Sequence, residues 1–260
     1  MCGTNDNFVL DIESYVGCRW ADLNGSLKCS RCEHEYSIKN GAFDFLCEGY
    51  PAKVDKTWYE KLTLQEKWWH EERSSVPRDI SKSSKWIASR HLVENYFKLD
   101  AVDTGSNGFL LDVGCGDGAR RSGFVRKKYL GIDPLLLCNA YPFPFFRGVA
   151  EQLPFTNNSF DVITSVESID HFSDTSRSMK EMVRCLAPGG ALFIFVGNAA
   201  IHDAAYLRRQ SQYSVTEDEV HTQNYSIDDL ACLLEGLFDK LDIDEEDGYV
   251  AAWGWGKRDA

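Results

Sequence analysis

The sequence lacks long apolar runs. Its longest uninterrupted apolar stretch, residues 191–196, is far too short to cross a bilayer as a helix, which takes about 20 residues. No basic segment followed by an apolar one opens the chain, so we expect no secretory leader. Internal repeats and low-complexity tracts are also missing. These absences favour a protein of the cytoplasm that does not associate with membranes.

Positive charge is scarce as well. The 260 residues include 28 Lys and Arg against 40 Asp and Glu, a net charge of −12. Nucleic-acid affinity depends on Lys and Arg neutralising phosphates, so this balance argues against a nucleic-acid partner. The basic stretch from Arg120 to Lys128 is better explained as a solvated helix face. The length suits one medium domain with an appendage.

Nine cysteines, an odd number without a leader, indicate a reducing compartment and free thiols. Residues 1–50 form a separate Cys- and Gly-rich module, in which Cys29 and Cys32 make a Cys-x-x-Cys knuckle. Structural zinc needs four nitrogen or sulfur ligands, usually from two such knuckles. Cys18 upstream and Cys47 downstream are the further candidate zinc ligands.

Residues 24–46 resemble the N-terminal zinc-ribbon module found on some methyltransferases and methyltransferase partners. In that pattern a first Cys-x-x-Cys ends near Cys18, but Tyr15 stands at its first position. The fourth ligand would then be Cys47, Cys2 or His34. The alternative is a ribbon without metal, held together by its apolar side chains.

Residues 51–105 read as two amphipathic helices, 57–73 and 82–99, rich in Trp and Tyr. Many of these aromatic side chains would belong to the core. A helical segment just before a cofactor-binding sheet also suits a lid over the site.

Residues 109–118 organise the chain. The apolar run 109–113 predicts a buried parallel strand, and glycines at 114, 116 and 118 predict a tight loop, the position at which open α/β sheets bind cofactors. Asp112 and Asp117 favour a cationic ligand such as S-adenosylmethionine (SAM) over a pyrophosphate. A dinucleotide or a plain turn remains open at this point. Asp133 ends a second strand, 129–133, where either cofactor's ribose would bind.

Three further segments, 146–155, 158–165 and 178–194, follow in order. Together with the glycine loop they resemble the class I SAM-dependent methyltransferases, in the branch that includes ubiquinone-type and many small-molecule enzymes. The resemblance covers roughly residues 85–245. It implies a Rossmann-like, mostly parallel seven-stranded α/β sheet in residues 106–260, with its last strand antiparallel.

The resemblance also implies a SAM site. Gly114 and Gly116 would pass under the methionine part, and Asp112 would face its ammonium directly or through water. Asp133 would hold the ribose, Ala150 and Glu151 would border the adenine, and Ser165 would line the floor. The remaining predicted cofactor contacts are Cys115 and Pro134. Among secondary elements, a short helix is expected over 120–128, and a helix capped by Ser226 through Leu237.

Methyl transfer requires a base only when the acceptor must lose a proton. His171, just past the fourth strand of the expected sheet, is the candidate base, with a wall histidine as the alternative. His202 is a weaker candidate, and His221 and Tyr225 are expected at the acceptor mouth. We expect methyl transfer to the O, N or C atom of a small-molecule acceptor, in secondary metabolism. The alternatives are a ribosomal-RNA methyltransferase and a non-catalytic SAM-fold protein that binds a partner.

Overall fold

The computed structural model describes residues 20–29, 33–46, 55–71, 98–99, 108–124, 126–198, 217–246 and 248–258. A single mixed sheet of ten strands, ordered β1-β2-β3-β6-β5-β4-β7-β8-β10-β9, runs through these residues. Its main strands are β4 (Phe109–Val113), β5 (Lys128–Asp133), β6 (Phe145–Arg147), β7 (Phe160–Val166), β8 (Leu186–Gly197), β9 (Phe238–Glu246) and β10 (Tyr249–Lys257).

Strands β6, β5, β4, β7 and β8 are parallel, and β10 runs antiparallel between β8 and β9. This arrangement confirms the predicted Rossmann-like sheet with an antiparallel strand near its end. The seven predicted strands correspond to β4 through β10. Apolar side chains of the parallel strands are buried on both faces, as a sheet covered on both sides requires.

The N-terminal strands continue the same sheet, which accounts for three strands beyond the predicted seven. They are β1 (Gly25–Lys28), β2 (Glu35–Lys39) and β3 (Ala42–Asp44). Strand β3 pairs in parallel with β6, placing Phe43 opposite Phe146, and the two rings stack with centroids 5.2 Å apart. The ribbon residues therefore share the hydrophobic core of the main sheet.

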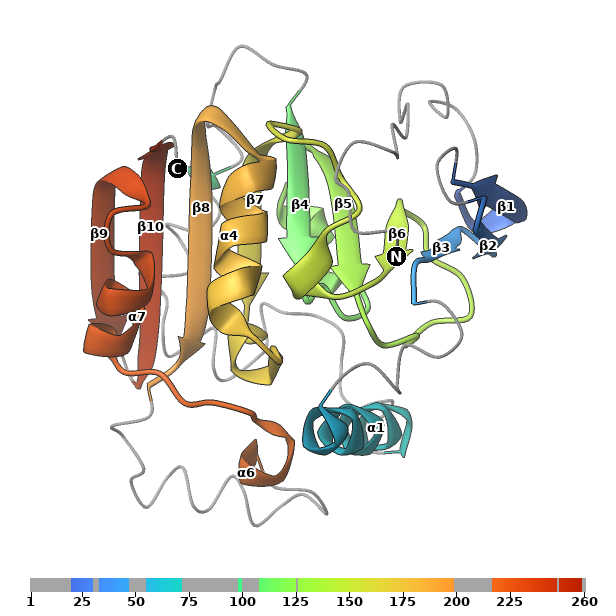
Figure 1. The fold of residues 1–260 in the computed structure, drawn as a ribbon, viewed down its shortest axis with the longest axis horizontal. Coiled ribbons are helices and arrows are strands. Elements are labelled where there is room, and N and C mark those ends of the chain that lie inside the picture. The colour runs from blue at the N-terminus through green and yellow to red at the C-terminus, as the bar shows by residue number, and fades with distance from the viewer. Residues whose placement is uncertain are drawn as a thin grey trace.

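Helices α4 (Thr175–Cys185) and α7 (Ile227–Leu234) cover one face of the sheet (Figure 1). Ser226 caps α7 as predicted, in a reciprocal pair with Asp229. The helix ends at Leu234, three residues before the predicted end, and Gly236 follows with a φ of 74°. Glycine at a positive φ is a common way to end a helix.

The helix predicted over 120–128 is wrong. The chain forms only a 3₁₀ turn, η7 (Ala119–Gly123), and Phe124 is already extended. Strand β5 begins at Lys128, so little chain remains for a helix, and Gly123 is a poor helix former.

Helix α1 (Lys56–Glu71) confirms the first of the two predicted amphipathic helices, whereas the second lies outside the described residues except for 98–99. Helices α1 and α6 (Glu217–Val220) lie beyond the carboxyl ends of the parallel strands (Figure 1). Among the described helices, none is long and apolar enough to span a membrane.

Candidate functional site

The glycine loop leaves the carboxyl end of β4. Gly114, Gly116 and Gly118 all adopt left-handed backbone, with φ of 75°, 57° and 72°. Residues that carry a side chain rarely adopt such φ values, which explains why glycine occupies all three positions. At Gly114 the space is also closed, because a methyl group there would lie 2.3 Å from the Cβ of Ser168. The loop is thus packed against the segment that follows β7 and presents its backbone at the end of the sheet.

Asp133, the last residue of β5, is tied to this loop. Its Oδ2 accepts a hydrogen bond from the Gly116 N–H at 2.8 Å, and its Oδ1 accepts one from the Leu135 N–H at 2.8 Å. Burial raises the pKa of this carboxyl to about 6. Each carboxylate oxygen keeps a lone pair, so two hydroxyl groups of a ribose could still donate to it. Pro134, the next residue, is half-buried and its carbonyl accepts from Arg147.

Asp112 lies inside the sheet and not on the loop surface. Its side chain is fully buried, and its two oxygens accept hydrogen bonds from the Tyr129 hydroxyl at 2.6 Å and from the Thr164 hydroxyl at 3.0 Å. Burial raises its pKa. Asp112 therefore links β4 to β5 and β7, and its predicted contact with the SAM ammonium, directly or through water, stays a prediction. Cys115 is likewise buried, and burial raises the pKa of its thiol.

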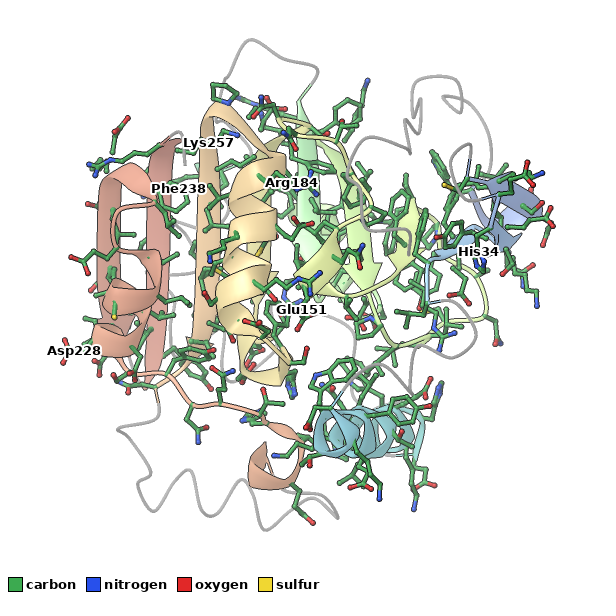
Figure 2. The ribbon with its side chains drawn as sticks, viewed as in Figure 1. His34, Glu151, Arg184, Asp228, Phe238 and Lys257 are labelled. Carbon is green, nitrogen blue, oxygen red and sulfur yellow. The ribbon has the colours of Figure 1, made fainter. Side chains whose placement is uncertain are left out.

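Glu151, in the 3₁₀ turn η8 (Ala150–Gln152), holds the loop that follows β7. Its Oε1 accepts from the Ser173 N–H at 2.6 Å, the Ser173 hydroxyl at 2.8 Å and the Asp174 N–H at 3.1 Å. Figure 2 labels Glu151 beside α4. Ala150 is also buried. In this arrangement Glu151 anchors the start of α4, and a role at an adenine stays a prediction.

Arg184, also labelled in Figure 2, connects α4 to the Leu153–Phe155 segment. Its guanidinium donates to the carbonyls of Phe155 and Leu153 and pairs with Glu181, which in turn accepts from the Leu153 N–H. These bonds fix the segment that follows η8.

Ser165 is fully buried near the end of β7, and its hydroxyl lies 2.6 Å from that of Ser168. Ser168 in turn donates to the carbonyl of Val113 at 2.9 Å. The chain after β7 is therefore held directly against the glycine loop. It continues into the 3₁₀ turn η9 (Ile169–His171), which carries the predicted base.

His171 lies among residues of two other segments, α1 and residues 220–221. Its Nδ1 is 3.2 Å from the carbonyl oxygen of Val220, and its Nε2 is 3.2 Å from the side-chain nitrogen of Gln65. Its own carbonyl accepts from the Trp58 indole at 2.7 Å. His221 packs edge-on against its ring, with centroids 4.7 Å apart. His202 lies outside the described residues.

Tyr225, predicted at the acceptor mouth, is part of the hydrophobic core, and two residues beside His171 were not predicted. Tyr225 is buried, and its hydroxyl is bonded to Thr175 and Gln223, so it belongs to the core. Sequence reasoning missed Gln65 and Asp170. The helical spacing of Trp58 and Gln65, seven residues apart on one face of α1, was the available signal.

Helix α1 also reaches the glycine loop. The Trp69 ring lies 3.8 Å from where a methyl group on Gly116 would be, so the indole borders the open side of the loop. The contacts of Trp58 and Trp69 place α1 across both the glycine loop and the His171 segment.

Most of the predicted zinc ligands lie outside the residues that the structure describes. Cys29 is buried at the start of the knuckle, whereas Cys18, Cys32 and Cys47, like Cys2, lie outside the described residues. His34 is exposed, with its ring against Tyr36 (Figure 2). Zinc in the ribbon therefore stays a prediction.

Comparison with known proteins bears on the glycine loop and the strands around it. Residues 111–194 match the family model described as a methyltransferase domain. An Encephalitozoon cuniculi protein described as a methyltransferase is 32% identical over 143 residues, 51% of this chain and 63% of that protein. Phthiotriol/phenolphthiotriol dimycocerosates methyltransferase 1 of Mycobacterium ulcerans is 33% identical over 137 residues, 48% of this chain and 50% of that enzyme. The chain thus spans between 50% and 63% of these two relatives.

Among solved structures, the complex between the Haloferax volcanii Trm112 methyltransferase activator and a methyltransferase contains a chain with a TM-score of 0.51. That chain is 16% identical, and the match covers 74% of this chain and 97% of that one, which shows a shared fold. Residues 111–194 therefore resemble a methyltransferase domain, and the chain shares the Rossmann-like fold of that solved chain.

Proposed function

We propose that the protein transfers a methyl group from SAM to a small-molecule acceptor. The observation that carries this proposal is the bond between Asp133 and the Gly116 N–H, which joins a glycine loop to an acidic strand end. Such a junction at the carboxyl ends of β4 and β5 suits an adenosine whose ribose hydroxyls need an acceptor. Carboxylates around the loop favour a cationic cofactor.

Methyl transfer from SAM requires the protein mainly to hold the acceptor in line with the methyl group. A lone pair on the acceptor forms a bond to the methyl carbon, the carbon–sulfur bond breaks, and its electron pair goes to sulfur, leaving S-adenosylhomocysteine. An acceptor hydroxyl or amine also releases a proton. Holding the two reactants in line can supply about 7–11 kcal/mol of the barrier. We assign this positioning to the glycine loop and to α1, which lies across it.

The acceptor would bind beside His171. The Nδ1–H of this residue donates to the Val220 carbonyl, which leaves a lone pair on Nε2. That lone pair could take a proton, as the sequence suggested, or bind a cation, and the neighbouring side chains favour the cation.

The small-molecule class of acceptor rests on two supports. The net charge of −12 disfavours RNA, and a relative from M. ulcerans is named as a methyltransferase of phthiotriol and phenolphthiotriol dimycocerosates. The Trp-lined α1 would suit an apolar or ring-bearing molecule. A role in secondary metabolism remains part of the proposal.

Methyl-labelled SAM tests the acceptor class. The protein is incubated with a cell extract separated into metabolites, RNA and protein, and label is counted in each fraction. We expect label among the metabolites, lost in the Asp133→Ala variant. Label in RNA alone would favour a ribosomal-RNA enzyme. No transfer to any fraction would favour a non-catalytic partner-binding protein.

A further inference from the structure

We propose that Asp170, His171 and His221 bind a divalent first-row transition-metal ion at the acceptor end of the site. One ligand atom from each side chain, a ring nitrogen or a carboxylate oxygen, lies within 4.8 Å of the other two. The two histidines come from segments 50 residues apart, η9 and the residue following α6. Binding of the ion depends on these three side chains and not on methyl transfer.

The distances suit one ion. Ligand atoms each about 2.1 Å from a metal lie at most about 4.2 Å apart. His171 Nε2 is 3.9 Å from Asp170 Oδ1, and His221 Nε2 is 3.3 Å from Asp170 Oδ2. One ligand atom from each of the three residues lies within 4.8 Å of the other two, so small side-chain rotations would bring all three within that limit.

One oxygen of the Asp170 carboxylate, Oδ1, lacks a hydrogen-bond partner among the described residues. The Asp170 side chain is only 9% exposed, and Oδ1 itself is buried. Its backbone is fixed, because the Asp170 carbonyl accepts from both the N–H and the hydroxyl of Thr222. A buried carboxylate oxygen that lacks a hydrogen-bond donor is costly unless a cation or water binds it.

Hydrogen bonds to neighbouring groups hold both histidines in positions suited to metal binding. Metal-binding histidines commonly donate their second ring N–H to a backbone carbonyl, which fixes the tautomer. The Nδ1 of His171 has such a partner in Val220, so its Nε2 faces the cluster with a lone pair. Gln65 now donates to that lone pair and would turn its amide to admit the ion, presenting its oxygen instead. Lys61 donates to the carbonyl of His221 and fixes the backbone there.

The donor set selects the kind of metal. Two imidazoles and one carboxylate suit Zn²⁺, Mn²⁺, Fe²⁺ or Co²⁺, whereas Mg²⁺ and Ca²⁺ prefer oxygen ligands alone. Three protein ligands leave coordination positions open. Ser168, two residues before Asp170, packs on Gly114, so the cluster adjoins the loop expected to hold the methionine part of SAM.

The ion's use rests on the proposed function. An acceptor with a hydroxyl or carboxylate oxygen would occupy an open position. A bound hydroxyl loses its proton to water more readily, because the cation stabilises the anion that forms. The oxygen then attacks the methyl carbon. We therefore infer an oxygen-bearing acceptor.

Cobalt binding tests the site. The full-length reduced protein is freed of metal with a chelator and titrated with Co²⁺, followed by visible absorption. Cobalt at a ribbon site shows thiolate-to-metal charge transfer, whereas cobalt on nitrogen and oxygen ligands does not. We expect one equivalent of the second kind, bound at least tenfold more weakly by His171→Ala and by His221→Ala. The matched control is His70→Ala, an exposed histidine in the last turn of α1.

The proposal would be overturned if every bound cobalt showed thiolate-to-metal charge transfer. It would also be overturned if the parent, His171→Ala and His221→Ala bound Co²⁺ with equal affinity. Melting temperature and SAM binding report whether each variant folds. If His171→Ala does not fold, Asp170→Asn and His221→Ala carry the test. If the parent protein binds SAM but shows no cobalt on nitrogen and oxygen ligands, the metal-site proposal is overturned and the proposed function is not. If the parent binds cobalt on nitrogen and oxygen ligands but does not bind SAM, the proposed function is overturned and the metal site is not.

Discussion

The carboxylate of Asp133 accepts a hydrogen bond from the Gly116 N–H at 2.8 Å. This bond joins the end of β5 to the loop after β4, two segments that would contact different parts of one cofactor. The side chain proposed to hold the ribose therefore also sets the backbone proposed to hold the methionine part. Binding at one end should be sensitive to the state of the other.

SAM affinity should consequently depend on pH. Burial raises the pKa of Asp133 from 3.8 to about 6, so folding stability contributed by this group falls as pH rises from about 4 to about 6. Ribose hydroxyls donate best to the ionised form, so SAM should bind more tightly above pH 6 and lose up to about tenfold per unit below it. Calorimetry across this range measures the effect. Asp133→Asn should bind weakly at every pH, and a flat profile in the parent would count against the assignment.

Gly114 should not tolerate alanine. The added methyl group would meet Ser168 at 2.3 Å, and the φ of 75° is itself unfavourable for a side chain. We expect Gly114→Ala to lose about 2 kcal/mol or more of unfolding free energy, measured by denaturant melts. Gly197→Ala is the matched control, since nothing lies within 4 Å of its methyl position and its φ is not positive. Similar losses in both variants would contradict the packing argument.

The sequence predicted the strand that leads into the glycine loop correctly. An unbroken apolar run followed by spaced glycines is a local signal, and β4 occupies the predicted residues, 109–113. The pairing of β3 with β6 could not be read in the same way, because their residues are about 100 positions apart and parallel pairing leaves no mark in either segment. The surroundings of Asp112 could not be read from the sequence for a related reason. Its register opposite Thr164, from β7, sets its surroundings.

The ribbon's contribution to the sheet can be measured. Phe43 is 1% exposed and stacks on Phe146 of the neighbouring strand. Removing a buried phenylalanine costs about 3–5 kcal/mol. We expect Phe43→Ala to lower the melting temperature of the entire sheet in a single cooperative transition. Tyr59→Ala, at an exposed aromatic, provides the comparison. An early ribbon transition followed by an unshifted main one would show that the ribbon melts independently.

Tyr129 should matter through Asp112. Its hydroxyl donates to the buried Asp112 carboxylate at 2.6 Å, and Tyr129→Phe would leave that oxygen without this donor. Such a loss costs about 1–3 kcal/mol, visible in chemical denaturation. SAM binding by the folded variant should change little, because Asp112 does not reach the loop surface. A large loss of SAM affinity with unchanged stability would support the direct role for Asp112 that the sequence suggested.

Isothermal titration of the purified full-length protein with SAM tests the central claim most directly. The glycine loop, Asp133 and the methyltransferase domain match together predict a saturable heat with a dissociation constant on the order of micromolar, about −8 kcal/mol. Asp133→Ala should weaken that binding at least tenfold. No heat from the folded parent protein even at millimolar SAM would contradict the account and favour a partner-binding protein built on the same fold.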